Sequence, residues 1–236
     1  MILSAAAAAL AGCQSTQDKS AELARSAKGL ARETGLRIGR ANNDVAIGSR
    51  VVVQDRTGAA AVVELRNSGR APQAAVPVQV TVRNARGRAL YSNTTPGLDA
   101  SLVSVPVLEP GRRVVWVDNQ IAVSGRAAKL DVRVGVARGR APGRVPRIRV
   151  SGLRLGRDSD GVFVRGVARN ASRVVQRRLA VYCVARKGGR IVAAGRATID
   201  RLPAGPSAKP TRFTLFLIGN PAGARLEATA PATVLK

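Results

Sequence analysis

Cys13 is the residue whose chemistry is most sharply defined by its neighbours. It follows an uncharged apolar run, MILSAAAAALAG, that ends in the small residues Ala11 and Gly12. The run falls within the roughly 7–15 apolar residues of a secretory signal and is shorter than the roughly 20 that a membrane-spanning helix needs. A polar stretch begins directly afterwards, at Gln14. This order predicts an exported chain with an N-terminal secretory signal.

Leu10-Ala-Gly-Cys13 resembles the lipobox of bacterial lipoproteins. The resemblance implies a lipid on the Cys13 thiol, removal of residues 1–12 as a signal peptide, and a lipid-anchored location on the extracytoplasmic face of the cell membrane. Residues 13–36 would form a lipidated polar spacer that is helical in part. Because no Lys or Arg precedes the apolar run, either the true start lies upstream or the signal is weak. The alternative is a buried Ala-rich helix with an incidental cysteine.

The rest of the sequence offers little for catalysis or metal binding. Histidine is absent, which removes the imidazole group as a general base or metal ligand. Cys183 lies in a strand-like run and is expected to be a buried structural thiol, with a reactive nucleophile as the weaker alternative. Asp158 and Asp160 lack further acids at calcium-loop spacing, so a turn is favoured there. We therefore predict no enzyme activity, no catalytic residue, no cofactor and no metal site.

The chain is strongly basic, with 39 Lys and Arg residues against 14 Asp and Glu residues and a formal net charge of +25. Six of the basic residues are Lys, and the Arg residues are scattered along every segment. This distribution favours the composition bias of a GC-rich genome, with Arg on solvated strand faces, over a dedicated polyanion site. The positive field would still attract anionic lipid headgroups or envelope polymers in a salt-dependent way.

From about residue 37 onward, short runs of alternating apolar residues are separated by turn signals. Val76, Val78, Val80 and Val82 form the clearest half-buried strand, and Asn84-Ala-Arg-Gly87 follows it as a hairpin turn. The pattern continues to the C-terminus and predicts an all-β sandwich.

The C-terminal part of the chain is predicted to contain a hairpin. Phe213 to Ile218 is predicted as one strand, and residues 219–223 (GNPAG) as the turn of a hairpin that returns through Leu226. The larger aromatic residues lie among apolar neighbours, so core packing is favoured over a role as stacking platforms for bases or sugars. These residues are Trp116, Phe163, Phe213 and Phe216.

The second half of the chain repeats the layout of the first. Each half has a strand that ends in an Asn-x-(Ser/Gly) turn, at Asn67 and Asn170. A Val-rich strand and a Gly-containing hairpin follow, and then Leu-(Glu/Pro)-x-Gly, which starts at Leu108 and Leu202. We interpret this order as an internal duplication. The predicted organisation is a first domain, a linker and a second domain, at residues 37–137, 138–147 and 148–236.

Residues of about 150–235 resemble the FxLYD-type domain, an immunoglobulin-like β-sandwich of extracytoplasmic bacterial proteins. The matching segments are Val164 to Asn170, the strand through Tyr182, Gly188 and Gly189 before Ile191, and Leu202 to Gly205. Leu179-Ala-Val-Tyr182 departs from the Phe-x-Leu-Tyr-Asp series that names the family. The first half resembles the same class, or adhesion-type Ig-like modules, through Val63 to Gly69 and Leu108 to Gly111. The resemblance implies two tandem immunoglobulin-like β-sandwich domains.

These observations lead to one main functional expectation and one alternative. We expect a non-enzymatic, membrane-anchored lipoprotein that acts as an interaction or scaffold module at the cell envelope. The alternative is an Arg-rich polyanion-binding protein, whose ligand would be an anionic envelope polymer or nucleic acid. The expected partners are the membrane, through the N-terminal lipid, and a protein or an anionic envelope polymer, whereas the scattered Arg residues disfavour nucleic acid.

Overall fold

A computed structural model describes residues 35–141 and 143–235 of the chain. The signal peptide predicted at residues 1–12, Cys13 and nearly all of the predicted spacer lie outside the described residues. The described part is built almost entirely of antiparallel strands, which confirms the all-β prediction. Its elements are β1 (Val45–Gln54), β2 (Ala59–Asn67), β3 (Gln73–Arg83), β4 (Ala89–Ser92), α2 (Ala100–Val103), β5 (Ser104–Leu108), β6 (Arg113–Ile121), β7 (Lys129–Val134), β8 (Ile148–Asp158), β9 (Gly161–Asn170), β10 (Gln176–Lys187), β11 (Arg190–Leu202), β12 (Thr211–Phe216), β13 (Ile218–Gly219) and β14 (Arg225–Thr229).

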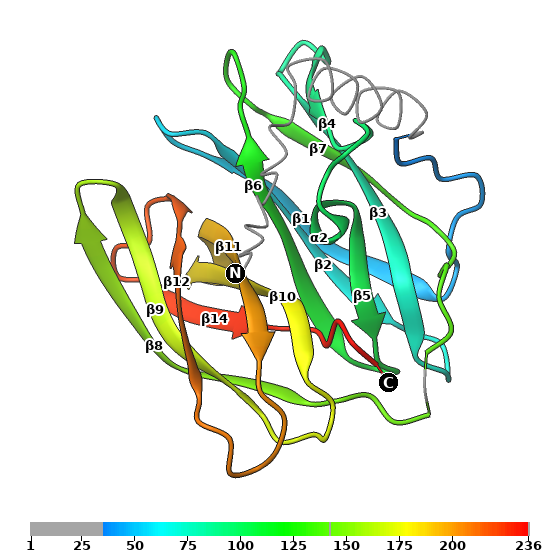
Figure 1. The fold of residues 1–236 in the computed structure, drawn as a ribbon. Helices are drawn as coiled ribbons and strands as arrows, with labels where there is room; N and C mark the ends of the chain where they lie inside the picture. The colour runs from blue at the N-terminus through cyan, green and yellow to red at the C-terminus, as the bar shows by residue number, and fades with distance from the viewer. Residues whose placement is uncertain (1–34, 142, 236) are drawn as a thin grey trace, which may run out of the picture.

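The strands form four layers that lie side by side (Figure 1). β3, with β4 and β5 on one edge and β7 on the other, makes the first layer. The second layer is the sheet β1-β2-β6, the third is β13-β11-β10-β14, and the fourth is β12-β9-β8. Sheets one and two belong to the first half of the chain, and sheets three and four belong to the second half. Each half is therefore a pair of packed sheets, in a β-sandwich-like arrangement.

The predicted Val-rich strand is the centre of the first layer. Val76, Val78, Val80 and Val82 are all fully buried in β3, as strict alternation requires of a strand with one face on a core. The predicted turn follows at Asn84, whose side-chain oxygen accepts hydrogen bonds from the backbone N–H groups of Arg86 and Arg88. The periodicity therefore identified this hairpin correctly.

The two middle layers pack against each other, which alternation within single strands does not predict. β2 is buried continuously from Ala59 to Leu65, so both of its faces are covered. β10 is covered in the same way. One set of its alternate residues lies in the core of the second half: Leu179, Val181, Cys183 and Ala185. The other set lies in the core of the first half: Ala180, Tyr182 and Val184. The two halves therefore share a continuous apolar interior.

The two halves also pair their strands in the same pattern, as the predicted duplication requires. The sheet β1-β2-β6 corresponds to β8-β9-β12, and the pairing of β3 with β7 corresponds to that of β10 with β14. The long strand β11 takes the place of β4, α2 and β5 together, because it pairs with β10 over nearly its whole length. The two halves thus share a strand-pairing pattern, and they differ most where β11 stands in place of β4, α2 and β5.

The repeated asparagines perform the same structural task in both halves. Asn67 donates a hydrogen bond from Nδ2 to the backbone oxygen of Ala71 at 2.8 Å, and Asn170 donates in the same way to Val174 at 2.8 Å. Each side-chain oxygen accepts from the backbone N–H two residues later. Asn67 and Asn170 are buried, so their amides satisfy backbone groups that water cannot reach. The motif is structural and closes the turn after β2 and β9.

The C-terminal hairpin prediction is wrong. Phe213 to Ile218 is not one strand, because β12 pairs with β9 in the fourth layer whereas β13 pairs with β11 in the third. The chain can cross between the layers because β11 has Gly195, where a Cβ atom would lie 2.1 Å from the backbone oxygen of Phe216. Residues 219–223 then carry the chain from β13 at one edge of the sheet to β14 at the other edge. Alternation alone does not report such a change of sheet.

Asn67→Ala should lower the free energy of unfolding by roughly 2–4 kcal/mol, because it leaves buried backbone groups without hydrogen-bond partners. Urea unfolding followed by circular dichroism measures the change. Asn220→Ala is the control, since Asn220 is exposed and caps a loop turn, and we expect it to change the free energy by less than about 1 kcal/mol. Equal effects of the two substitutions would contradict the structural role assigned to Asn67.

Candidate functional site

The structure places Cys183 in the interior of the second half. Its side chain is fully buried in β10 and lies in the core cluster of that half. Burial raises the pKa of the thiol to about 12, and the negative charge of Glu227 acts in the same direction. A thiol with a raised pKa is a poor nucleophile, because the thiolate is the reactive form. Cys183 is therefore a packing residue, as the sequence indicated.

Asp158 and Asp160 lie in the turn between β8 and β9. The Asp158 carboxylate accepts hydrogen bonds from the backbone N–H groups of Asp160 at 3.0 Å and of Gly161 at 3.1 Å. This is the turn role that was favoured over a calcium site. Within residues 35–141 and 143–235, no cluster of three or more Cys, Asp or Glu residues could hold a metal ion.

The four larger aromatic residues fall into two groups. Trp116 and Phe213 lie in the two cores, as predicted. Phe163 and Phe216 lie on the outer side of the fourth layer as cross-strand neighbours, with ring centroids 6.1 Å apart in an edge-to-face arrangement. Phe163 is nevertheless buried, as predicted. The side chain of Phe216 remains 40% exposed, so its predicted place in the core is wrong. The reason is strand alternation, which assigns Phe213 and Leu215 to the inner face and Phe216 to the outer one.

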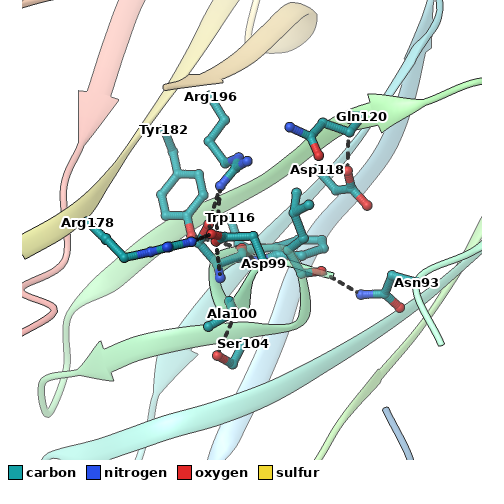
Figure 2. A network of polar contacts seen from close by, with 12 residues as sticks. Asn93, Asp99, Ala100, Ser104, Trp116, Asp118, Gln120, Arg178, Tyr182 and Arg196 are labelled. Atoms are coloured by element: carbon teal, nitrogen blue, oxygen red, sulfur yellow. Dashed lines mark hydrogen bonds and ion pairs between the residues drawn. The ribbon is translucent and has the colours of Figure 1, made fainter. Parts of the chain in front are cut away.

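The most connected polar cluster lies where α2 meets the second half (Figure 2). Asp99 caps α2, and its carboxylate accepts a hydrogen bond from the backbone N–H of Ser101 at 2.9 Å. The same carboxylate forms ion pairs with Arg178 of β10 and with Arg196 of β11. Burial opposes its ionisation, but the hydrogen bonds from Ser101 and the ion pairs outweigh burial and lower the pKa of Asp99 to about 2. Asp99 is thus ionised and joins the halves.

The backbone oxygen of Ser101 is the centre of this cluster. It accepts hydrogen bonds from Nε1 of Trp116 at 2.8 Å and from the hydroxyl of Tyr182 at 3.2 Å. Trp116 belongs to β6 of the first half, and Tyr182 belongs to β10 of the second. Both side chains are fully buried, and burial also raises the pKa of Tyr182. One carbonyl of α2 therefore satisfies the polar tips of the two largest buried residues.

Asp118 lies close to this cluster and is itself fully buried. Its carboxylate accepts hydrogen bonds from the hydroxyl of Tyr91 at 2.7 Å and from the backbone N–H of Gln120 at 3.0 Å. Burial raises the pKa of Asp118, although these hydrogen bonds and the positive charge of Arg196 favour the ionised form. Arg196 thus lies in the field of two carboxylates, and its side chain is only 6% exposed.

A second polar link between the halves lies farther along the same interface. Arg186 of β10 forms an ion pair with Glu64 of β2 and donates from Nε to Glu227 of β14 at 3.1 Å. The Arg186 and Glu64 side chains are 18% and 10% exposed. Because both charges are largely removed from water, each depends on the other for stabilisation. The pair fixes how β2 and β10 are placed relative to each other.

The sequence did not single out the residues of these links, although it contained signals for them. Glu64 is the one carboxylate in the apolar run of β2, and Arg196 interrupts a similar run in β11. A charge at a core-facing position requires a partner. The Asp99-Ala-Ser101 sequence is a helix-capping signal. What could not be found from the sequence was which charges pair, because the partners lie far apart in the chain.

A half-open cavity of about 390 Å³ lies between the two halves near the C-terminal segment. Four arginines and one carboxylate are among its lining residues: Arg112, Arg113, Arg147, Arg149 and Glu109. Its remaining walls come from apolar parts of β5, β6, β8 and the segment after β14. The cavity is basic, and its size is within the roughly 300–1,000 Å³ of ligand sites. Positive charge in the lining attracts anions electrostatically.

No protein-family model matches the chain, and no curated protein matches it. No helix in the described ranges is both long enough and apolar enough to cross a membrane. The polar clusters at the interface hold the two halves together by hydrogen bonds and ion pairs. These links cross-link the two halves into one body, and most of the other basic groups lie on its outside.

Asp99→Asn should lower the free energy of unfolding at pH 7 by roughly 1–3 kcal/mol, because it removes a charged hydrogen-bond acceptor. The pKa of Asp99 in the folded chain, about 2, lies below its ordinary value of 3.8. Its stabilising effect is therefore present above about pH 4 and is lost as the pH falls towards 2. Urea unfolding at several pH values should show the difference between variant and parent shrinking on acidification.

The control for Asp99 is Asp200→Asn, which changes an exposed carboxylate on β11. It should alter the free energy of unfolding by less than about 0.5 kcal/mol at pH 7. A difference for Asp99→Asn that stays constant between pH 7 and pH 2 would show that the carboxylate charge is not what joins the halves.

Cys183 should resist thiol reagents in the folded chain and react once the chain unfolds. Its burial and raised pKa both keep the thiolate concentration near zero at neutral pH. In a Cys13→Ser chain, the rate of labelling by a disulfide reagent should rise by several orders of magnitude on addition of urea. Rapid labelling without urea would contradict the buried placement of the thiol.

Proposed function

We propose that this chain is a non-enzymatic module of the cell envelope that is tethered to the membrane through a lipid on Cys13. It acts as an interaction or scaffold protein through its all-β body. The observation that carries the proposal is the cross-linked interface between the halves. Charged residues of both halves form ion pairs that hold the layers together. Glu64 pairs with Arg186, and Asp99 pairs with Arg178 and Arg196.

Such an interface favours a rigid scaffold over a protein whose two halves move about a hinge. The halves share an apolar core as well as the two polar links, and separating them would expose Tyr182 and leave buried charges unpaired. Unpaired buried charges cost several kcal/mol each. Enzymes that close over a substrate usually move elements of low stability. A body with fixed layers instead keeps its loops and outer faces at constant relative positions, which suits recognition of a partner.

The tether proposed from the sequence suits this body. From Cys13 to the first described residue, Gly35, the chain could reach up to about 75 Å if fully extended. The body could therefore remain close to the membrane surface and still turn toward partners. We also propose that the halves are immunoglobulin-like and that the second belongs with FxLYD-type domains. Their shared strand-pairing pattern supports a common ancestor for the two halves.

Binding of polyanions is the second candidate function. It is favoured by the basic cavity between the halves, with Arg112, Arg113, Arg147 and Arg149 in its lining. Positive charge on an exposed surface attracts anionic polymers and lipids with an affinity that falls as salt rises. Retention on heparin well above physiological salt would indicate a dedicated site, whereas early elution would indicate diffuse charge.

Lipid anchoring is tested by fractionating cells of the chain's own host and by mass spectrometry of the purified protein. The expected N-terminal peptide begins at Cys13 and carries a diacylglyceryl group. Cys13→Ala should shift the protein from the membrane fraction to the soluble extracytoplasmic fraction, because the thioether cannot form. Cys183→Ser is the matched control and should leave the protein in the membrane fraction. A mature chain that still begins at Met1 would overturn the proposal.

A further inference from the structure

We infer that the outer face of the sheet β12-β9-β8 binds the surface of an anionic lipid bilayer. This face is named the arginine face, and it consists of Arg149, Arg154, Arg165, Arg169 and Arg212. Arg149 lies at the end of this face that borders the cavity between the halves, which it also lines. The inference rests on the proposal that the chain works beside a membrane, but it does not require the lipid on Cys13. Figure 1 shows this sheet as the outermost layer of the stack.

Strand alternation sorts the residues of this sheet onto two faces. In β9, Val164 and Ala168 lie in the core of the second half, whereas Arg165 and Arg169 are exposed. Because successive residues of a strand point to opposite sides, the two arginines share the outer side. In β12, the same alternation puts Phe213 in the core and Arg212 outside. The outer side of the sheet is therefore its basic side.

Strand register brings the arginines of different strands together. Arg149 of β8 pairs with Arg169 of β9, and Arg154 of β8 pairs with Arg165 of β9. Directly opposed residues of neighbouring strands have Cβ atoms about 4.5–5.5 Å apart. The irregular register of β8 between Ser151 and Arg154 produces the second of these pairs. The sheet thus contains two pairs of directly opposed arginines.

Two opposed arginine pairs are unfavourable for folding, because like charges directly across a ladder repel each other. In the part of the chain that the structure describes, none of the five arginines has a carboxylate within ion-pair distance. The one carboxylate in these three strands is Asp158, at the hairpin end, where it accepts hydrogen bonds from backbone N–H groups. A bound anionic surface would supply the missing counter-charge.

One of these arginines is held in place by an aromatic ring. The guanidinium carbon of Arg165 lies 4.6 Å from the ring centroid of Phe163, which is within the range of a cation–π contact. The Phe163 ring covers Gly156 of β8, where a Cβ atom would lie 2.4 Å from it. Phe216 stands beside Phe163 and remains 40% exposed. Phe is among the apolar side chains with which interfacial segments enter the boundary between water and lipid.

The shape of this surface favours a bilayer over a linear polymer. Sites for single-stranded nucleic acid and similar polymers are usually grooves that follow the polymer backbone. The arginine face is one side of a three-stranded sheet, so its five charges point to the same side and can approach an extended surface together. Charges act on an anionic surface only within about a Debye length, roughly 8 Å at physiological salt. Charges on one side of the sheet can therefore contribute to binding of the same surface.

The test is sedimentation of the full chain, carrying Cys13→Ser so that no lipid is attached, with vesicles of phosphatidylcholine and phosphatidylglycerol in equal parts. We expect binding to these vesicles that weakens with salt, and none to vesicles of phosphatidylcholine alone. Each arginine removed from the arginine face should weaken binding roughly fivefold, the factor that corresponds to about 1 kcal/mol per basic residue at an anionic surface. Arg154→Gln, Arg165→Gln, Arg169→Gln and Arg212→Gln together, none of which lines the cavity between the halves, should therefore abolish measurable binding.

The matched control removes the same charge from the first half, with Arg86, Arg88, Arg126 and Arg133 changed to Gln. All four are exposed, and the control should keep most of the vesicle binding. Circular dichroism and urea unfolding of both variants show that each is folded. Because the lipid is absent from every sample, failure of this test leaves the lipid anchor at Cys13 untouched, and failure of anchoring leaves this test untouched.

Three results would overturn the inference. Equal loss of vesicle binding in both variants would mean that the diffuse net charge binds the membrane. Absence of binding to anionic vesicles by the parent chain would exclude a membrane role for this face. Tight binding to heparin or single-stranded DNA that depends on the arginine face, without vesicle binding, would assign the face to a linear polyanion.

Discussion

The burial of β10 on both of its faces is the constraint on which the rest of this structure depends. Leu179 and Val181 fill the core of the second half, while Ala180 and Tyr182 fill that of the first. A fully buried apolar side chain stabilises a fold by about 1.5–3 kcal/mol, so a strand used twice contributes to two cores at once. The same strand then dictates what its neighbours must be. β2 is apolar through both faces because β10 and β11 cover the side that would otherwise meet water.

The charges at this interface have a different physical role from the apolar contacts. Burying an ion pair gains little net stability over a well-packed apolar pair, but it penalises any arrangement that leaves one charge alone. Glu64 with Arg186, and Asp99 with Arg196, therefore select one placement of the halves among the many that an apolar surface would allow. The carbonyl of Ser101 also selects this placement. It accepts hydrogen bonds from both Trp116 and Tyr182 only when α2 lies between the halves.

The arginines of this chain separate into two populations once the structure is known. Arg186 and Arg196 are largely buried and belong to the interface, whereas most of the others are exposed and surround the body. Some of the exposed arginines lie directly opposite each other. Strand register on the fourth layer places Arg149 opposite Arg169 and Arg154 opposite Arg165. Composition bias can account for how many arginines there are. It does not account for a sheet face that lacks a paired acid.

The all-β class, the strand at Val76 to Val82 and the repeated asparagine turns were determined by local sequence, because alternation and turn chemistry act over a few residues. The repeat itself was also visible, since Asn67 and Asn170 close equivalent turns. The contact between the halves was decided only by the tertiary structure. A buried strand face looks the same in sequence whether its own sandwich or a neighbouring one covers it. The change of sheet after Phe216 and the pairing of Asp99 with β10 and β11 were hidden for the same reason. Both depend on residues that are distant in the chain and near only after folding.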